Sequence, residues 1–387
     1  MVGHTAEANE NFVEHGLQTR AILNLGWEHD TNPQEWAQRL KGPRTGLSLG
    51  YADFGNADSL GGAITVMPFI EFNAFRKKNL KVQTGMGLAY FNKIYDPITN
   101  PDNKAITTDL AWSFRLFMHY QIISGERIDW RMGVGYYHHS NGHTRLPNQG
   151  LNSFLVSLSA DIKNPSGVNK NDGDFAIPEF SRSIYSYASM RAGYGSNVLS
   201  TADPFNDKKG VYTVAGEYGK VLNNTFKLGG GAFYRFYQQY YDYISNNESL
   251  VQDGQEFDFY AENPGRYGSN FGLFLKGEVL LNHFGLEGFL GFSLHKPAYK
   301  IDWRLNEGWD NPPRVLPPNW VFGQYDTKFT LKHIISTRLG IKYYLIGTQK
   351  APVNNIYLAF HVNTNLGQAD FTELSLGYVY NFNFKKR

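Results

Sequence analysis

Three polar side chains interrupt an apolar pattern in the stretch GVGYYHHSNGHTRLPNQGLNSFLVSLSADI, residues 133–162. His138 and Ser140 are two residues apart, and Asn152 follows after a short polar segment. An imidazole beside a seryl hydroxyl is the pair that nucleophilic catalysis needs, because the ring takes the hydroxyl proton while a third group orients the ring. These residue types and their spacing therefore point to a serine nucleophile with its base.

Two expected strands would bring these residues together. The strand expected over residues 127–140 ends its even-numbered column with His138 and Ser140, and the rest of that column is apolar: Ile128, Trp130, Met132, Val134 and Tyr136. The strand expected over 150–163 begins its own apolar column with Asn152, and a hairpin loop over 141–149 returns it toward the first strand. Residues i and i+2 on one strand face are ~7 Å apart at Cα, a gap that an imidazole can bridge to a seryl oxygen.

Long alternating stretches recur along the chain and predict an all-β membrane protein. Residues 79–91, 109–122 and 372–384 each place apolar and aromatic side chains on one face and polar or small ones on the other. A soluble β-sandwich also alternates, but these strands reach ~10 residues and carry aromatics toward the ends of the apolar face, as membrane-spanning strands do. We predict a transmembrane antiparallel β-barrel of the bacterial outer membrane with about 16 strands, 12 to 16 being possible. A site on its outer, lipid-facing wall predicts a lipid substrate.

The connections indicate one barrel domain over residues 1–387. Short and long connections mostly alternate, which is typical of short periplasmic turns and long outer loops. The loops over 242–267 and 299–325 are long enough to plug or cap the barrel. The long segment 164–179 breaks the alternation, and we interpret it as a join between two halves of the chain.

Composition excludes several other classes of protein. The net charge of +2 gives no sign of a nucleic-acid partner, and the absence of cysteine excludes disulfides and thiolate metal sites. No run of 18 apolar residues suggests a transmembrane helix. Residues 1–12 lack the apolar core of a signal peptide, so we expect an exported protein to be in its mature form here.

The stretch HHSNGHTRLPNQGLN, residues 138–152, resembles the signature of the PagL family of outer-membrane lipid A 3-O-deacylases and their larger relatives, the bacterial acyloxyacyl hydrolases. The family pattern is His, one residue, Ser-Asn, then Pro-Asn, one residue, Gly, one residue and an acid. The matching residues are His138, Ser140, Asn141, Pro147, Asn148 and Gly150, whereas the family's Glu falls on Asn152. The resemblance covers roughly residues 1–163, where an eight-stranded member of the family would end. Residues 180–387 would be additional strands and long outer loops.

The resemblance implies hydrolysis of an ester-linked acyl chain on lipid A, the membrane anchor of lipopolysaccharide. Ser140 would be the nucleophile, His138 its general base, and Asn152 the group that holds the imidazole. Asn141, Asn148 and backbone N–H groups around Gly142 would be oxyanion donors. Arg145 and Lys104, in outer loops, are possible contacts for the lipid A phosphates. No metal or other cofactor is implied. Membrane lipids are expected partners beside the substrate, and the sequence does not tell which protein partners the chain has.

Two other readings of the same residues stay open. The chain could be a channel or structural barrel with a degenerate site, since 16 strands would enclose room for an aqueous lumen. In that case His138 and Ser140 would be ordinary polar residues at the rim. A metal site built from His138, His139 and His143 is disfavoured because alternation places His139 on the opposite face.

Overall fold

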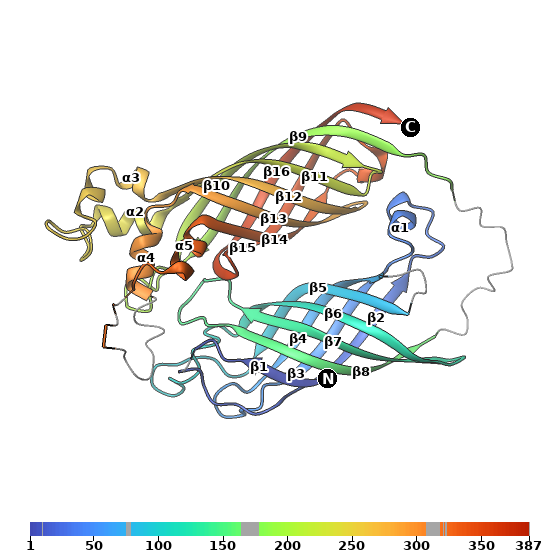
Figure 1. The fold of residues 1–387 in the computed structure, drawn as a ribbon, viewed down its shortest axis with the longest axis horizontal. Helices are drawn as coiled ribbons and strands as arrows, with labels where there is room; N and C mark the ends of the chain where they lie inside the picture. The colour runs from blue at the N-terminus through green and yellow to red at the C-terminus, as the bar shows by residue number, and fades with distance from the viewer. Residues whose placement is uncertain are drawn as a thin grey trace. The chain divides into compact units, whose positions relative to one another are not determined.

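A computed structural model describes residues 1–9, 11–74, 79–163, 178–306, 318–319, 321 and 323–386. The chain divides into two compact units, Met1–Asn141 with Pro147–Phe180, and Gly142–Leu146 with Ser181–Arg387. Each unit contains a closed barrel of antiparallel strands, as Figure 1 shows. No helix within the described part of the chain is long and apolar enough to cross a membrane.

The first unit forms an eight-stranded barrel in which sequential strands pair and the last closes on the first. The closing pair joins β1 to β8 over five residue pairs, from Val2 opposite Val156 to Ala6 opposite Asn152. The strands are β1 (Val2–Ala6), β2 (Gln18–Glu28), β3 (Arg44–Asp53), β4 (Gly62–Asn73), β5 (Leu80–Phe91), β6 (Leu110–Ser124), β7 (Ile128–Ser140) and β8 (Leu151–Ile162). A short helix, α1 (Glu35–Arg39), lies in the connection between β2 and β3.

The second unit repeats this plan with its own eight strands. Here β9 pairs with both β10 and β16, so the ring closes without the first barrel. The strands are β9 (Ser183–Asn197), β10 (Lys209–Leu222), β11 (Phe226–Tyr237), β12 (Ser269–Leu281), β13 (Phe284–His295), β14 (Ile335–Tyr344), β15 (Asn354–Asn365) and β16 (Gln368–Lys386).

The prediction of a single barrel domain over residues 1–387 is therefore wrong, although the described residues do contain 16 strands. Alternation determines which face of a strand is apolar, but it carries no signal for which distant strand closes a ring. Both closures satisfy the same physical demand, since a strand edge left open in lipid would expose unpaired N–H and C=O groups. The predicted join falls between the two rings, and its residues 164–177 lie outside the described part of the chain.

The predicted alternation is confirmed along the strands. On β16, Leu374 and Leu376 are 59% and 57% exposed, whereas Glu373 and Ser375 between them are 0% and 2% exposed. The exposed apolar side chains form the outer wall of an outer-membrane-type barrel, where lipid rather than water would cover them.

Buried polar side chains fill the interior of both barrels. In the first, Arg115 is fully buried and donates to Asn24 Oδ1 at 3.1 Å and to Tyr137 Oη at 3.3 Å. In the second, Glu287 accepts from Lys276 Nζ at 2.9 Å and pairs with Arg338. An eight-stranded barrel has an interior narrow enough for its own side chains to fill, without the aqueous channel of a 16-stranded porin. The wide lumen expected from a ring of 16 strands is therefore absent from the described part of each barrel.

Helices cover one end of the second barrel, as Figure 1 shows. They are α2 (Gln238–Ser245), η1 (Asp258–Glu262), α3 (Pro264–Tyr267), α4 (Tyr299–Asn306) and α5 (Thr327–Ile334). The loops expected over 242–267 and 299–325 thus contain helices, and residues 307–317, 320 and 322 of the second lie outside the described part. Buried side chains such as Tyr240, Ile244 and Ile301 pack into one apolar cluster that fixes these helices to the barrel.

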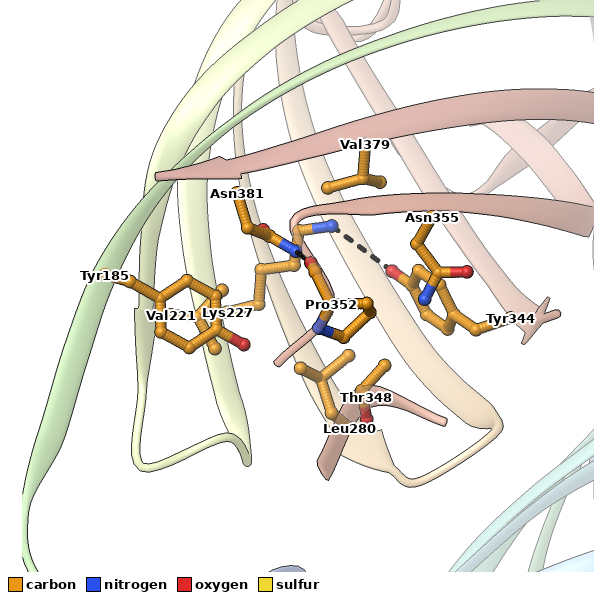
Figure 2. A pocket seen from close by; sticks show the side chains of 10 residues that line it. All are labelled: Tyr185, Val221, Lys227, Leu280, Tyr344, Thr348, Pro352, Asn355, Val379 and Asn381. Carbon is orange, nitrogen blue, oxygen red and sulfur yellow. Dashed lines mark hydrogen bonds between the residues drawn. The ribbon is translucent and has the colours of Figure 1, made fainter. Parts of the chain in front are cut away.

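The opposite end of the second barrel carries a short helix, η2 (Thr348–Lys350), and a small pocket. Figure 2 shows Lys227 reaching into this pocket and donating to Tyr344 Oη at 3.2 Å, while Asn381 Nδ2 donates to Pro352 O at 2.7 Å. The other lining residues are Tyr185, Val221, Leu280, Thr348, Asn355 and Val379.

Candidate active site

The predicted hairpin of β7 and β8 is confirmed, and it places His138 directly opposite Asn152 in the strand register. His138 follows Met132 and Val134 on the outward face of β7, and those two side chains are 51% and 52% exposed. Directly opposed side chains on one face of an antiparallel pair lie ~5 Å apart at Cβ. The register thus brings an imidazole and an amide from two strands into contact on the outer wall.

Asn152 holds the imidazole of His138 by its amide oxygen. The distance from His138 Nδ1 to Asn152 Oδ1 is 2.8 Å. An amide oxygen can only accept a hydrogen bond, so this contact requires the ring proton on Nδ1. The other ring nitrogen, Nε2, then carries a lone pair and can act as a base. An amide in this position therefore sets the same tautomer that a carboxylate would set.

Asn148 holds the hydroxyl of Ser140. Its Nδ2 donates to Ser140 Oγ at 2.9 Å, and its Oδ1 accepts from the backbone N–H of Asn141 at 3.2 Å. The second bond fixes which end of the amide faces the serine, because an N–H group can only be met by the oxygen. Ser140 is 5% exposed and Asn141 3% exposed, so these polar contacts are shielded from water.

The loop that supplies Asn148 is tied to the neighbouring loop between β5 and β6. Gln149 N donates to Lys104 O at 3.0 Å and Gly150 N donates to Ala105 O at 3.0 Å. Thr107 Oγ1 also donates to the carbonyl oxygen of Pro147. Three hydrogen bonds over four consecutive residues leave the backbone around Asn148 little freedom, which favours a fixed position for its amide.

Gly150 is required by both its conformation and its surroundings. Its φ of 72° lies in the left-handed region that residues with a side chain avoid. A Cβ at this position would lie 2.9 Å from His139 O and 3.3 Å from His138 Cε1. Only glycine lets the loop backbone pass this close to the imidazole.

The structure joins His138 to Asn152, and it joins Ser140 and Asn141 to Asn148, all in the first unit. Gly142 and Arg145 belong to the segment Gly142–Leu146, which is part of the second unit. There Gly142 has a φ of 68°, and Leu146 exchanges hydrogen bonds with the side chain of Asn206. Lys104 is half-buried and contributes its backbone carbonyl to the loop contact described above.

The sequence reasoning misses one residue that contacts the site, Tyr136. Tyr136 was assigned to the apolar column, yet its hydroxyl donates to Asn152 Oδ1 at 2.6 Å. The signal for it is the strand register, which makes Tyr136 and Asn152 diagonal neighbours on one face. His139 points inward, as the alternation predicts, and there Arg20 Nη2 donates to its Nε2 at 2.9 Å.

His139 anchors the end of β7 inside the barrel. Its ring lies edge-on to Phe54 and Phe91, with centroids 5.8 and 5.5 Å away, and stacks on Tyr137. This packing fixes the backbone between His138 and Ser140. No group of three or more His, Asp or Glu side chains within the described residues is placed to hold a metal ion.

Comparison with known families gives one match, which falls within the first barrel. Residues 21–161 match the family described as Lipid A 3-O-deacylase (PagL). The matched segment runs from β2 to β8 and contains the hairpin with His138, Ser140 and Asn152. It supports the resemblance drawn from the HHSNGHTRLPNQGLN stretch.

Other comparisons add no functional information. No curated protein sequence matches the chain. Among solved structures, a mutant of the Rh. blastica porin is 11% identical, covering 98% of this chain and 96% of that chain with a TM-score of 0.17. CdiB from Escherichia coli is 8% identical, covering 98% of this chain and 62% of that chain with a TM-score of 0.20.

Proposed function

We propose that this protein, whose first barrel matches the PagL lipid A 3-O-deacylase family over residues 21–161, is a serine esterase of the bacterial outer membrane that removes an ester-linked acyl chain from lipid A. The observation that carries the proposal is the pair of side-chain contacts on one hairpin. Asn152 accepts from His138 Nδ1 at 2.8 Å, and Asn148 donates to Ser140 Oγ at 2.9 Å. Together they leave His138 Nε2 as a base and hold the serine oxygen beside an amide donor.

In the proposed reaction, His138 Nε2 takes the proton of Ser140 as Oγ attacks the ester carbonyl carbon. The carbonyl oxygen becomes an oxyanion, stabilised by Asn148 Nδ2 and by backbone N–H groups near Asn141 and Gly142. Collapse breaks the bond to the sugar oxygen, which receives the proton from the imidazolium. Water, deprotonated by His138, then attacks the acyl-serine, releases the fatty acid and restores the Ser140 hydroxyl.

Asn152 replaces the carboxylate of the family, and this sets the expected rate. A neutral amide orients the imidazole but gives the imidazolium less electrostatic stabilisation than an anion does. In serine proteases the change from acid to amide costs ~10⁴ in rate, whereas papain-like enzymes work with an asparagine in this position. We propose a slow deacylase whose rate rises when Asn152 is replaced by an acid.

The position of the site supports lipid A as substrate, because His138 lies on a wall whose other side chains face lipid. We propose that Lys104 and Arg145 contact the lipid A phosphates, since each carries a cation on a loop outside the strands. Metal and cofactor play no part in the proposed steps.

The test is mass spectrometry of lipid A from cells that express the chain behind an export signal. We expect lipid A to lose one acyl group with the wild-type chain and to stay intact with Ser140→Ala. Ser157→Ala, which removes a buried serine from the inner face of β8, is the matched control and should behave like the wild type. Intact lipid A with the wild type and also with Asn152→Glu, while both are folded in the outer membrane, would contradict the proposal.

A further inference from the structure

Asn152 accepts hydrogen bonds from two residues of β7 at once. Its Oδ1 lies 2.8 Å from His138 Nδ1 and 2.6 Å from Tyr136 Oη. Tyr136 and His138 are two residues apart on the same face, and their rings are parallel within 13°. The ring of Tyr136 also packs against Phe154, the residue opposite it on β8. The phenol is thus held in place by its ring while its hydroxyl points at the amide.

An asparagine in this position can adopt two orientations that differ in which atom, Oδ1 or Nδ2, faces His138, whereas the two ends of a carboxylate are equivalent. Rotating the amide by 180° exchanges Oδ1 and Nδ2 with almost no change in shape. In the rotated state Nδ2 would donate to His138 Nδ1, and the ring proton would have to move to Nε2. The imidazole would then present an N–H group instead of a lone pair to Ser140. Something other than shape must therefore keep the oxygen toward the histidine.

We propose that Tyr136 is the positioning residue that selects the productive orientation of Asn152, an inference that rests on the function proposed above. The separation of 2.6 Å is short even for an O–H···O bond and too short for a typical N–H···O bond. In the rotated state the phenol would meet an amide N–H₂ group, and its own proton would lose its acceptor. A carboxylate presents an oxygen to His138 Nδ1 in either orientation because both of its ends are acceptors. The amide of Asn152 has one oxygen, and the hydroxyl of Tyr136 keeps that oxygen toward His138.

The proposal predicts that the effect of Tyr136 depends on the residue at position 152. Tyr136→Phe keeps the ring and its packing against Phe154 but removes the donor. We expect it to lower the deacylation rate about five- to tenfold in the wild-type background, the effect of losing one hydrogen bond. In the Asn152→Asp background, where both oxygens are acceptors, we expect Tyr136→Phe to change the rate less than twofold. Tyr90→Phe, which removes the hydroxyl of an exposed tyrosine elsewhere in the first barrel, is the control in both backgrounds.

A second measurement reads the tautomer of His138 without reference to activity. Nitrogen-15 NMR of histidine-labelled protein, with the His138 signals assigned by His138→Gln, should show the proton on Nδ1 in the wild type. Tyr136→Phe should move part of the population to Nε2, and Tyr136→Phe with Asn152→Asp should not.

Equal losses of rate in the two backgrounds, or an unchanged tautomer in Tyr136→Phe, would overturn the role of Tyr136. If the wild-type chain cleaves no lipid A, the proposed function fails, and the tautomer measurement alone still decides whether Tyr136 orients Asn152.

Discussion

Replacing Asn148 by alanine removes a side chain of the loop after β7 that donates a hydrogen bond to Ser140 Oγ. The variant loses the 2.9 Å bond from Nδ2 to the serine oxygen and the 3.2 Å bond from Asn141 N to Oδ1. It keeps the loop backbone, because the bonds from Gln149 N and Gly150 N to the β5–β6 loop involve no side chain of Asn148. Asn148→Ala therefore tests the amide and not the loop.

The expected loss follows from what such a donor contributes. Removing one preorganised oxyanion donor typically costs about 2.7–4 kcal/mol of transition-state stabilisation. At ~1.36 kcal/mol per tenfold, this corresponds to a rate about 10²- to 10³-fold lower. The assay is the time course of acyl release from lipid A vesicles by purified protein, followed by mass spectrometry. Gln149→Ala is the matched control, since it removes a neighbouring amide side chain and leaves both of the Asn148 bonds in place.

A rate within threefold of the wild type for Asn148→Ala, with Ser140→Ala inactive, would refute the assignment of Asn148 as an oxyanion donor. A parallel loss in Gln149→Ala would show instead that the loop had been disturbed. The shift in electrophoretic mobility on heating reports whether each variant is folded. A variant with the wild-type melting behaviour has lost activity for a reason other than loss of fold.

Three further predictions address the surroundings of the site and the second barrel. Gly150→Ala should lower activity far more than its cost in stability of about 1–2 kcal/mol would suggest, because the added Cβ would lie 3.3 Å from His138 Cε1; activity equal to that of the wild type would contradict this. Burial lowers the pKa of Lys296, between β13 and α4, to about 7. From pH 7 to about 10 the unfolded chain therefore holds a proton that the folded chain lacks. The free energy of unfolding should rise with pH over this range by up to about 1.4 kcal/mol per pH unit. Thermal unfolding in detergent should show this rise in the wild type and a flatter profile in Lys296→Met, whereas a flat wild-type profile would contradict the reasoning. Planar-bilayer recordings should show no steady conductance steps of porin size, because side chains such as Arg115 and Glu287 fill the two interiors, and such steps would refute a filled barrel.

The sequence predicts those features of the fold and the site that depend on residues close together in the chain. A period of two within one strand predicts which side chains face outward. It puts His138 on the outer face, where the strand register pairs it with Asn152. The motif also singled out Asn148 and Gly150, whose contacts with Ser140 and His138 appear in the structure. Each of these inferences depends on residues fewer than twenty positions apart.

Non-local features could not be predicted in this way. The closure of β1 on β8 and of β9 on β16 joins residues far apart in the chain, and nothing in a strand's alternation names its distant partner. The role of Tyr136 was hidden for a related reason. A tyrosine in an apolar column is normally interpreted as an apolar side chain because of its aromatic ring. The register of β7 on β8 is needed to show that the hydroxyl of Tyr136 reaches Asn152.

The outward placement of His138 has a kinetic consequence. A substrate that reaches the site along the wall of β7 and β8 arrives by lateral diffusion in two dimensions, so the concentration that matters is its mole fraction in the leaflet. Diluting a vesicle suspension with buffer should leave the turnover per protein molecule unchanged, whereas diluting lipid A with inert lipid in the same vesicle should slow it. Saturation curves drawn against bulk molarity would then differ between preparations with the same protein and different lipid content.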